Sequence, residues 1–231
     1  FDYYIPNAEQ HLAKEFVQTN ASKSYISFEP LGIILSIMPW NFPFWQVFRF
    51  AVPSLMAGNV TVLKHAPNVP QCAEAIQRVF QDERLPKHLL LNYFLTNDDV
   101  AKLVSAPEIA GVTFTGSDTT GAIIAGLAGQ NIKKCVVELG GNDPFIVLDD
   151  ADLDLAIAGA IKSRSINSGQ SCNAAKRFIV TEKNYSLFIE KLTNAVNALK
   201  VGDPLHEDTN IGPIARKDLA EKVRSQVTKT I

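Results

Sequence analysis

The chain has 231 residues, of which 46% are hydrophobic and 20% are charged, and its formal net charge is −2. This composition is typical of a globular protein and excludes a disordered chain. The near-neutral charge, without a basic block, gives no support for nucleic-acid or anionic-membrane binding, and no apolar run reaches the ~18 residues of a membrane span. Residues 1–20 lack a signal-peptide pattern, so a cytoplasmic location is expected.

The predicted elements alternate between helices and strands. In chain order we expect a helix over residues 8–18, a strand over 25–38, a helix over 44–56, a strand over 60–64, a helix over 69–81, a strand over 89–95, a helix over 97–105, a strand over 111–114, a helix over 118–129, a strand over 134–139, a strand from 143, a helix over 153–167, a strand over 176–181 and a helix over 216–227. This alternation predicts an α/β fold with a doubly wound parallel sheet.

Three local patterns carry these assignments. The spacing of Leu12, Phe16 and Val17 places them on one face of the first helix. The run 31–38 is continuously apolar, as in parallel strands covered on both faces. Asn68 can cap the helix that follows it.

The cysteines and histidines are sparse. Cys72, Cys135 and Cys172 form no CxxC pair, and the four histidines show no HxxxH spacing. We therefore expect neither a disulfide framework nor a metal site.

Cys172 is the most informative of the three cysteines. It lies in Ser168-Gly169-Gln170-Ser171-Cys172-Asn173, a tight turn between a predicted helix and a predicted strand. An isolated cysteine is usually a buried apolar residue. The small and polar neighbours of Cys172 favour an approachable backbone instead, which suits a nucleophile.

Two features suit a nucleotide. One is the run between a predicted strand and a predicted helix, Thr115-Gly116-Ser117-Asp118-Thr119-Thr120-Gly121, because a helix N-terminus suits a pyrophosphate. This run is not the GxGxxG fingerprint, and Ser117 or Asp118 could instead be a plain helix cap. Lys64 ends a buried strand, where α/β sheets bind ligands; alternatively it extends to water.

Two further side chains suit acyl chemistry. Asn41 lies between Trp40 and Phe42 in a turn locked by Pro39 and Pro43, so its amide could form half of an oxyanion hole or simply shape the turn. Glu138 is an acid in an apolar strand, where burial would raise its pKa and suit a general base; the alternative is a solvated strand residue.

Together these segments resemble a known family. Five motifs occur in the order and approximate spacing of NAD(P)-dependent aldehyde dehydrogenases: Pro39-Trp-Asn-Phe-Pro43, Thr61-Val-Leu-Lys64, Phe114-Thr-Gly-Ser117, Val137-Glu-Leu-Gly-Gly141 and Gly169-Gln-Ser-Cys172. The resemblance extends from about Tyr25 to the end of the chain. Within the family it is strongest to succinate-semialdehyde dehydrogenases, through residues 62–68 and 174–177.

The resemblance implies catalytic roles. Cys172 is similar to the family nucleophile, Asn41 to the side-chain donor that joins the Cys172 backbone N–H around the oxyanion, and Glu138 to the base that activates water. A thiohemiacetal would form on the sulfur, hydride would leave for the nicotinamide, and the resulting thioester would be hydrolysed.

The resemblance also implies cofactor contacts. Lys64 and Ser117 match residues that contact the adenosine ribose and the pyrophosphate, while Trp40 and Gly116 line the same groove. No metal is implied. Many members carry a glutamate three residues after the lysine, where this chain has Pro67, so the cofactor is NAD or NADP.

Substrate choice is less determined. Arg49 matches an arginine that holds the substrate carboxylate in some succinate-semialdehyde enzymes. It could equally be a helix-surface residue with a buried stem. Ile166 stands where a second such arginine often occurs. Succinate semialdehyde is therefore the favoured aldehyde without being fixed.

The implied domains are incomplete at both ends. We expect a Rossmann-like dinucleotide-binding domain over residues 1–139 and part of an α/β catalytic domain over 140–231, divided at Gly140-Gly141. The chain is expected to be a fragment of a longer protein, homo-oligomeric when full length. Two alternatives stay open: a cysteine-dependent acyl-transfer enzyme without redox chemistry, and a non-catalytic remnant.

Overall fold

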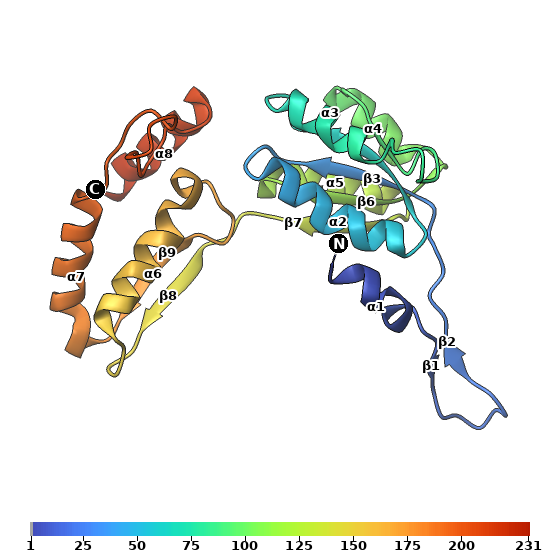
Figure 1. Ribbon diagram of the computed structural model, residues 1–231, viewed down its shortest axis with the longest axis horizontal. Coiled ribbons are helices and arrows are strands. Elements are labelled where there is room, and N and C mark those ends of the chain that lie inside the picture. Colours follow the sequence, from blue (N-terminus) through green and yellow to red (C-terminus); the bar gives the residue numbers. More distant parts are fainter. Residues whose placement is uncertain (1) are drawn as a thin grey trace. The chain divides into compact units, whose positions relative to one another are not determined.

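The computed structural model describes residues 2–231, which form two compact units that divide between Leu139 and Gly140 (Figure 1). Gly140 and Gly141 open the second unit. The assignment of the units as dinucleotide-binding and catalytic domains stays a prediction. Each unit is an α/β structure.

The first unit is built on a five-stranded parallel sheet. Its order is β5-β4-β3-β6-β7, and every neighbouring pair is parallel. The strands are β3 (Ile33–Met38), β4 (Val60–His65), β5 (Leu90–Asn92), β6 (Ile109–Thr115) and β7 (Lys134–Glu138). The central β3 is buried along almost its whole length, which explains its continuous apolar sequence.

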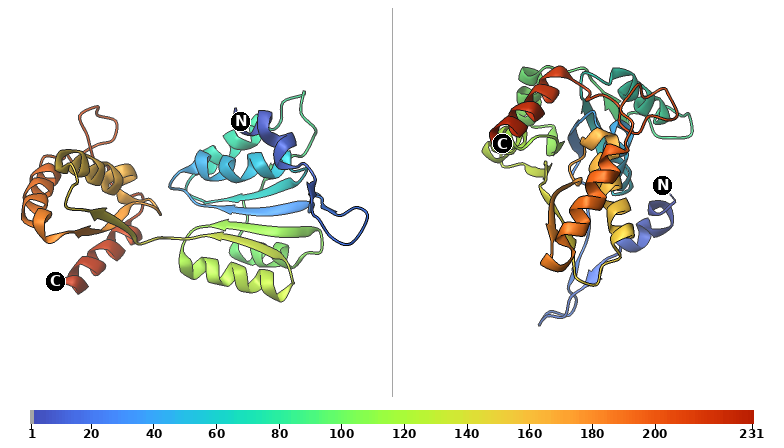
Figure 2. Two further views of the ribbon diagram at one scale, coloured as in Figure 1. Left: turned by 90° about the horizontal axis from the view of Figure 1, so that it is seen from below. Right: turned by 90° about the vertical axis from the view of Figure 1, so that its left-hand side faces the viewer.

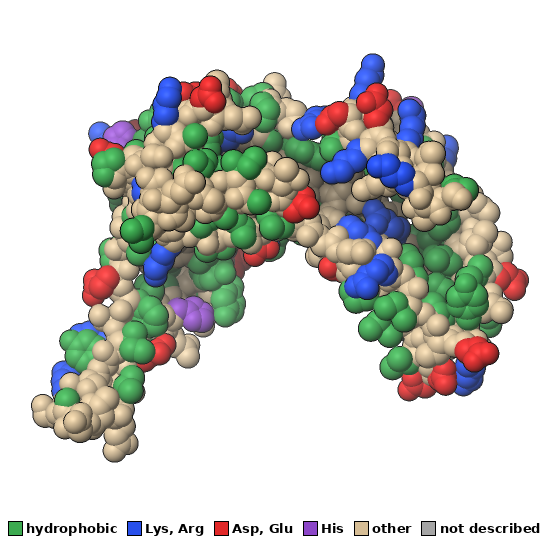
Figure 3. Space-filling model, turned by 180° about the vertical axis from the view of Figure 1, so that it is seen from behind, with side chains coloured by type: hydrophobic (Ala, Val, Ile, Leu, Met, Phe, Trp, Pro, Cys, Tyr) green, Lys and Arg blue, Asp and Glu red, His purple; other side chains and the backbone are tan. Residues whose placement is uncertain are grey.

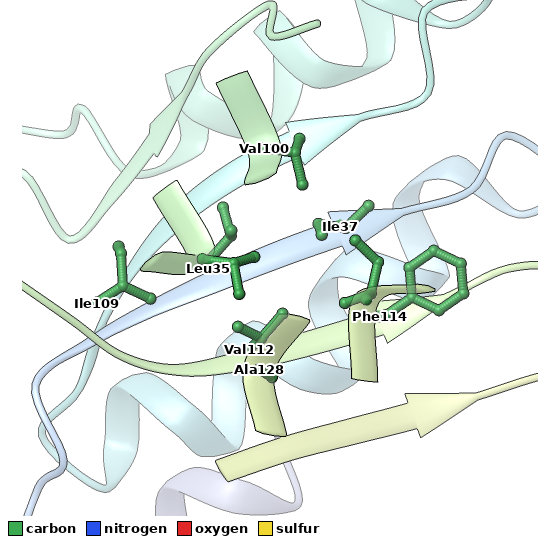
Figure 4. Close-up of a cluster of buried hydrophobic side chains, with 9 residues drawn as sticks. Leu35, Ile37, Val100, Ile109, Val112, Phe114 and Ala128 are labelled. Carbon is green, nitrogen blue, oxygen red and sulfur yellow. The ribbon is translucent and has the colours of Figure 1, made fainter. Parts of the chain in front are cut away.

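Helices cover both faces of this sheet (Figure 2). They are α2 (Pro43–Met56), α3 (Pro70–Val79), α4 (Asn97–Ser105) and α5 (Asp118–Gln130). The helices α2 and α3 pack on one face and α4 and α5 on the other, so there are two hydrophobic clusters. In one of them, Leu35 and Ile37 of β3 lie beside Val112 and Phe114 of β6 (Figure 4). The doubly wound prediction is confirmed.

The N-terminal segment differs from the expectation. The first helix, α1, spans Tyr4–His11, and the expected helix over 8–18 is wrong beyond it. Strand β1 (Glu15–Phe16) instead pairs antiparallel with β2 (Tyr25–Ile26). The Phe16 side chain is 71% exposed, and its ring packs against Tyr25 with the centroids 5.9 Å apart. This cross-strand contact replaces the expected helical face.

The expected cap of α3 is also wrong. The helix begins at Pro70 and its N-cap is Val69, without a side-chain cap bond. Proline suits the first helical position because its φ is already helical and it needs no N–H partner there. Pro70 therefore places the cap position one residue beyond Asn68.

The second unit contains two parallel strands, β8 (Asp143–Val147) and β9 (Ala175–Val180). Its helices are α6 (Leu153–Ser165), the short 3-10 helix η1 (Ile166–Gly169), α7 (Glu182–Asn197) and α8 (Lys217–Thr230). The core joins Val147, Ile157 and Phe188. Ile146 and Ile179 point away from it and are 60% and 49% exposed; Figure 3 shows hydrophobic side chains at the surface. No helix within residues 2–231 is long and apolar enough to cross a membrane.

Candidate active site

The carboxyl edge of the five-stranded sheet gathers most of the residues that the sequence singled out. From β3 the chain proceeds to β4 and β5 on one side, and then returns to β6 on the other side of β3. The point between β3 and β6, where this direction reverses, is where open α/β sheets bind ligands. Trp40 and Asn41 follow β3, and Gly116 and Ser117 follow β6. These four residues flank the crevice position.

The loop after β6 is shaped by tight packing. Ser117 is the N-cap of α5, and its Oγ accepts a hydrogen bond from the Thr120 N–H at 3.3 Å. The cap role that the sequence left open is therefore observed. A Cβ at Gly116 would lie 2.5 Å from the ring of Phe114, and one at Gly121 would lie 2.4 Å from Leu139. Close packing against Phe114 and Leu139 therefore explains why both positions are glycine, whether or not a nucleotide binds there.

Lys64 places a positive charge at this edge. It is the second-last residue of β4 and is half-buried. Loss of hydration lowers the pKa of its ammonium group. None of the ion pairs among residues 2–231 includes it. Lys64 is thus a partly desolvated cation without a carboxylate partner, and it lies at the same edge as the N-terminus of α5. The ammonium group and the N–H groups of that helix terminus together fit a phosphate-bearing nucleotide.

His65 connects this edge to the turn that carries Asn41. Its Nδ1 accepts a hydrogen bond from the Ala66 N–H at 2.8 Å, so Nε2 carries the proton and donates to the Pro43 carbonyl at 3.0 Å. Burial, the largest effect, and the nearby Lys64 charge lower the pKa of His65. His65 was not among the predicted site residues, although a histidine that directly follows Lys64 in a buried strand was a usable signal.

Glu138, the last residue of β7, is not buried among apolar groups. Its side chain is 54% exposed, and its Oε2 lies 3.2 Å from Nη2 of Arg49, which is 32% exposed. The apolar burial that the sequence suggested is therefore absent, and the solvated alternative describes the position better. Arg49, on α2, reaches across to the carboxyl edge.

Cys172 lies in the other unit, on the loop between η1 and β9. The thiol is free and half-buried. Asn167, Ser168 and Gly169 in η1 all have positive φ, at 51°, 54° and 76°, so the chain turns sharply before the cysteine. Another cysteine, Cys135, lies on β7, where burial raises the pKa of its thiol and disfavours the nucleophilic thiolate.

Side chains around the loop fix its two ends. The Arg164 guanidinium donates to the Gly169 carbonyl at 2.8 Å and to the Ala175 carbonyl at 3.1 Å. The Gln170 side chain accepts from the Ala215 N–H at 3.0 Å. Arg164 was not among the predicted site residues, because nothing in the helical pattern around it indicates which backbone oxygens it reaches.

The structure thus brings together six of the predicted site residues on one edge of the first unit: Trp40, Asn41, Lys64, Gly116, Ser117 and Glu138. Arg49 joins them through its ion pair with Glu138. The meeting of Cys172 with Asn41 and Glu138 stays a prediction. No cluster of three metal-binding side chains occurs in the described part of the chain.

The fold defines a protein of the doubly wound α/β class, with a polar edge at the carboxyl ends of its parallel strands. The family model for the aldehyde dehydrogenase family matches residues 1–231. The chain belongs to the aldehyde dehydrogenase family, as the five motifs indicated.

Individual relatives agree with this assignment. A probable succinate-semialdehyde dehydrogenase [NADP(+)] of Synechocystis is 52% identical over 229 residues, which cover 99% of this chain and 50% of the relative. The succinate semialdehyde dehydrogenase [NAD(P)+] Sad of Escherichia coli K12 is 48% identical over 230 residues, which cover 100% of this chain and 50% of the relative. The chain spans about half the length of the curated relatives it matches.

A solved structure matches as well. The succinic semialdehyde dehydrogenase of Streptococcus pyogenes, in complex with NADP+ as the cofactor, superposes with a TM-score of 0.94 at 36% identity. The match covers 98% of this chain and 50% of that one.

Proposed function

We propose that the protein oxidises an aldehyde to its carboxylic acid with NAD(P)+ through a covalent intermediate on Cys172. The observation that carries the proposal is the edge formed by Lys64 and the N-terminus of α5, where a half-buried cation without a carboxylate partner lies at the edge of the sheet at which such folds bind nucleotides. The names of the Synechocystis, Escherichia coli and Streptococcus pyogenes proteins, which are succinate-semialdehyde dehydrogenases, support the same reaction.

The chain's own groups suit each step. The Cys172 thiolate attacks the aldehyde carbon, and the Cys172 N–H and the Asn41 amide donate to the oxygen that gains negative charge; each such donor is typically worth roughly 3 kcal/mol. The bound nicotinamide supplies the hydride acceptor. Glu138 then takes a proton from the water that attacks the thioester, which releases the acid and the thiol.

Nucleotide and substrate contacts complete the proposal. Lys64 and Ser117 hold the ribose and the pyrophosphate, and Trp40 and Gly116 line the groove. Many family members have an acid at the position of Pro67, and that acid would repel a 2′-phosphate; Pro67 does not. NADP is therefore favoured over NAD. This agrees with the name of the Synechocystis relative and with the cofactor in the Streptococcus pyogenes structure, whereas the Escherichia coli relative is named for NAD(P)+. Arg49 holds the carboxylate of succinate semialdehyde. The working protein is a cytoplasmic homo-oligomer.

The decisive experiment is aldehyde-dependent reduction of NADP+ by the protein, expressed with whatever sequence flanks this chain in its natural gene. Cys172→Ala should abolish turnover and leave nucleotide affinity nearly unchanged. Cys72→Ala, which removes another half-buried free thiol, is the matched control and should remain active. Thioester hydrolysis by the wild type without nucleotide reduction would favour the acyl-transfer enzyme without redox chemistry. Absence of both activities in the wild type would favour the non-catalytic remnant.

A further inference from the structure

The Lys176 side chain ends among the backbone carbonyls of the Cys172 loop. Its Nζ lies 3.1 Å from the Ser171 oxygen, 2.8 Å from the Cys172 oxygen and 3.1 Å from the Ala174 oxygen. An ammonium group carries three N–H donors and no acceptor, so one lysine can bind all three oxygens at once. Because the donor is charged, these hydrogen bonds are stronger than neutral ones.

These bonds fix the direction of the Cys172 backbone N–H. The peptide that joins Ser171 to Cys172 is trans, so its C=O and N–H point in opposite directions. The C=O is directed at Lys176, and the N–H is therefore directed away from it. No described residue accepts a hydrogen bond from this N–H, which leaves it available to a bound group.

Packing on the far side limits how the loop can move. A Cβ at Gly141 would lie 2.9 Å from the Cys172 oxygen, so the segment before β8 already contacts the loop backbone closely. The Cys172 carbonyl is thus held between Gly141 and the Lys176 ammonium. A rotation of either adjoining peptide would break a Lys176 bond or collide with Gly141.

We propose that Lys176 is a positioning residue that aims the Cys172 N–H at the oxygen of the group attacked by the Cys172 thiolate. The inference rests on the proposed function in one respect, the assignment of Cys172 as the nucleophile. Lys176 itself does not touch the substrate. It acts by holding the peptide whose N–H stabilises the oxyanion.

The test compares two reactions of the same sulfur in the protein expressed with its natural flanking sequence. With p-nitrophenyl acetate, an S–C bond forms, the ester C–O bond breaks, p-nitrophenolate leaves, and an oxyanion forms on the way. With iodoacetamide, an S–C bond forms and iodide leaves, and no oxygen gains charge. Mass spectrometry of the peptide that contains Cys172 locates both products. Neither reaction uses a nucleotide.

The variant is Lys176→Met, which keeps the length of the side chain and removes its donors. Acylation of Cys172 should slow by about tenfold to a hundredfold, since a misdirected donor costs less than a deleted one, while alkylation stays within about twofold. Lys176→Arg, which retains charge and N–H donors, should recover part of the acylation rate. Lys183→Met is the matched control, because the Lys183 Nζ also donates to a loop carbonyl, that of Asp149 at 3.0 Å, but away from the cysteine.

The other outcomes are equally clear. A parallel fall of both reactions would reduce Lys176 to a structural role and overturn the proposal, as would unchanged rates in Lys176→Met. Absence of Cys172 acylation in the wild type would overturn it as well. If the wild type fails to oxidise aldehydes while the difference between the two reactions persists, only the proposed function fails.

Discussion

Arg49 on α2 and Glu138 at the end of β7 form an ion pair in which Nη2 lies 3.2 Å from Oε2. Both side chains are partly exposed, so the pair contributes at most about 1 kcal/mol to folding. Its importance concerns the site, because the sequence assigned the two residues to different steps. A guanidinium has five N–H donors, so Arg49 can contact a substrate carboxylate as well as Glu138.

The first prediction concerns Arg49. Arg49→Gln should lower kcat/KM for succinate semialdehyde by about tenfold to a hundredfold, because a charge-assisted hydrogen bond to the substrate carboxylate is lost. The uncharged aldehyde butanal should be affected much less. Steady-state rates with the two aldehydes measure the difference.

The control for Arg49 removes a comparable surface ion pair elsewhere. Arg78→Gln breaks the pair between Arg78 and Glu74, at 3.9 Å on α3, and should leave both rates unchanged. An equal fall for both aldehydes in Arg49→Gln would mean that Arg49 acts on Glu138 alone and does not select the substrate.

The second prediction concerns Glu138. Glu138→Gln removes the base for thioester hydrolysis and keeps the shape of the side chain. The variant should release about one equivalent of reduced nicotinamide per chain in a rapid burst and then turn over slowly, because the acyl group stays on Cys172. Stopped-flow absorbance measures the burst, and Glu74→Gln serves as the control. Linear turnover at the wild-type rate would exclude Glu138 as the base.

The third prediction tests cofactor choice at Lys64. Lys64→Met should raise the Kd for NADP+ by about tenfold to a hundredfold, the loss expected for a charge-assisted bond, and that for NAD+ by less. Titration of nucleotide fluorescence gives both constants. Lys102→Met, an exposed lysine in the last turn of α4, should change neither. Equal losses for the two nucleotides would place Lys64 away from the 2′-phosphate.

The parallel sheet could be predicted because its signals are local. The continuous apolar run that became β3 needs only burial on both faces, and the helix after Ser117 needs only its cap. The expectation failed at residues 12–17, where three apolar residues at helical spacing did not outweigh the pairing of Phe16 with Tyr25. Such pairing depends on a partner that the local pattern does not contain.

The candidate site shows the same limit. Motif order was sufficient to single out Lys64, Glu138 and Cys172 as candidates, but it did not reveal which groups surround them. The contact between Arg49 and Glu138 joins residues far apart in the chain, and the contacts of Lys176 depend on the path of a loop with positive φ angles. Neither follows from periodicity or from spacing.

The fourth prediction follows from His65, whose pKa is lowered in the folded chain, mainly by burial. Between its unfolded pKa near 6.5 and the lower folded value, the unfolded chain binds more protons. Stability is therefore full above about pH 6.5 and is lost as the pH falls through the folded pKa, by at most about 1.4 kcal/mol per pH unit from this group. His65→Gln should remove this part of the pH dependence.

Urea unfolding at several pH values tests the His65 prediction. Both tryptophans, Trp40 and Trp45, lie in the same unit as His65, so their fluorescence reports its unfolding. His88→Asn is the control, because His88 is exposed and asparagine tolerates its φ of 65°. If wild type and His65→Gln lose stability in parallel below pH 6.5, another group is responsible.

The fifth prediction uses two adjacent glycines that differ in their surroundings. A Cβ at Gly141 would lie 2.9 Å from the Cys172 carbonyl oxygen, whereas one at Gly140 meets no atom within 4 Å. Gly141→Ala should therefore displace the cysteine loop and lower kcat by about tenfold or more, with an overpacking cost of roughly 1–3 kcal/mol. Gly140→Ala should be close to wild type. Nucleotide affinity should hold in both variants, because Lys64 and Ser117 lie in the other unit. Equal activity of the two variants would show that the loop backbone yields at little cost, and the close contact at Gly141 would then have no catalytic consequence.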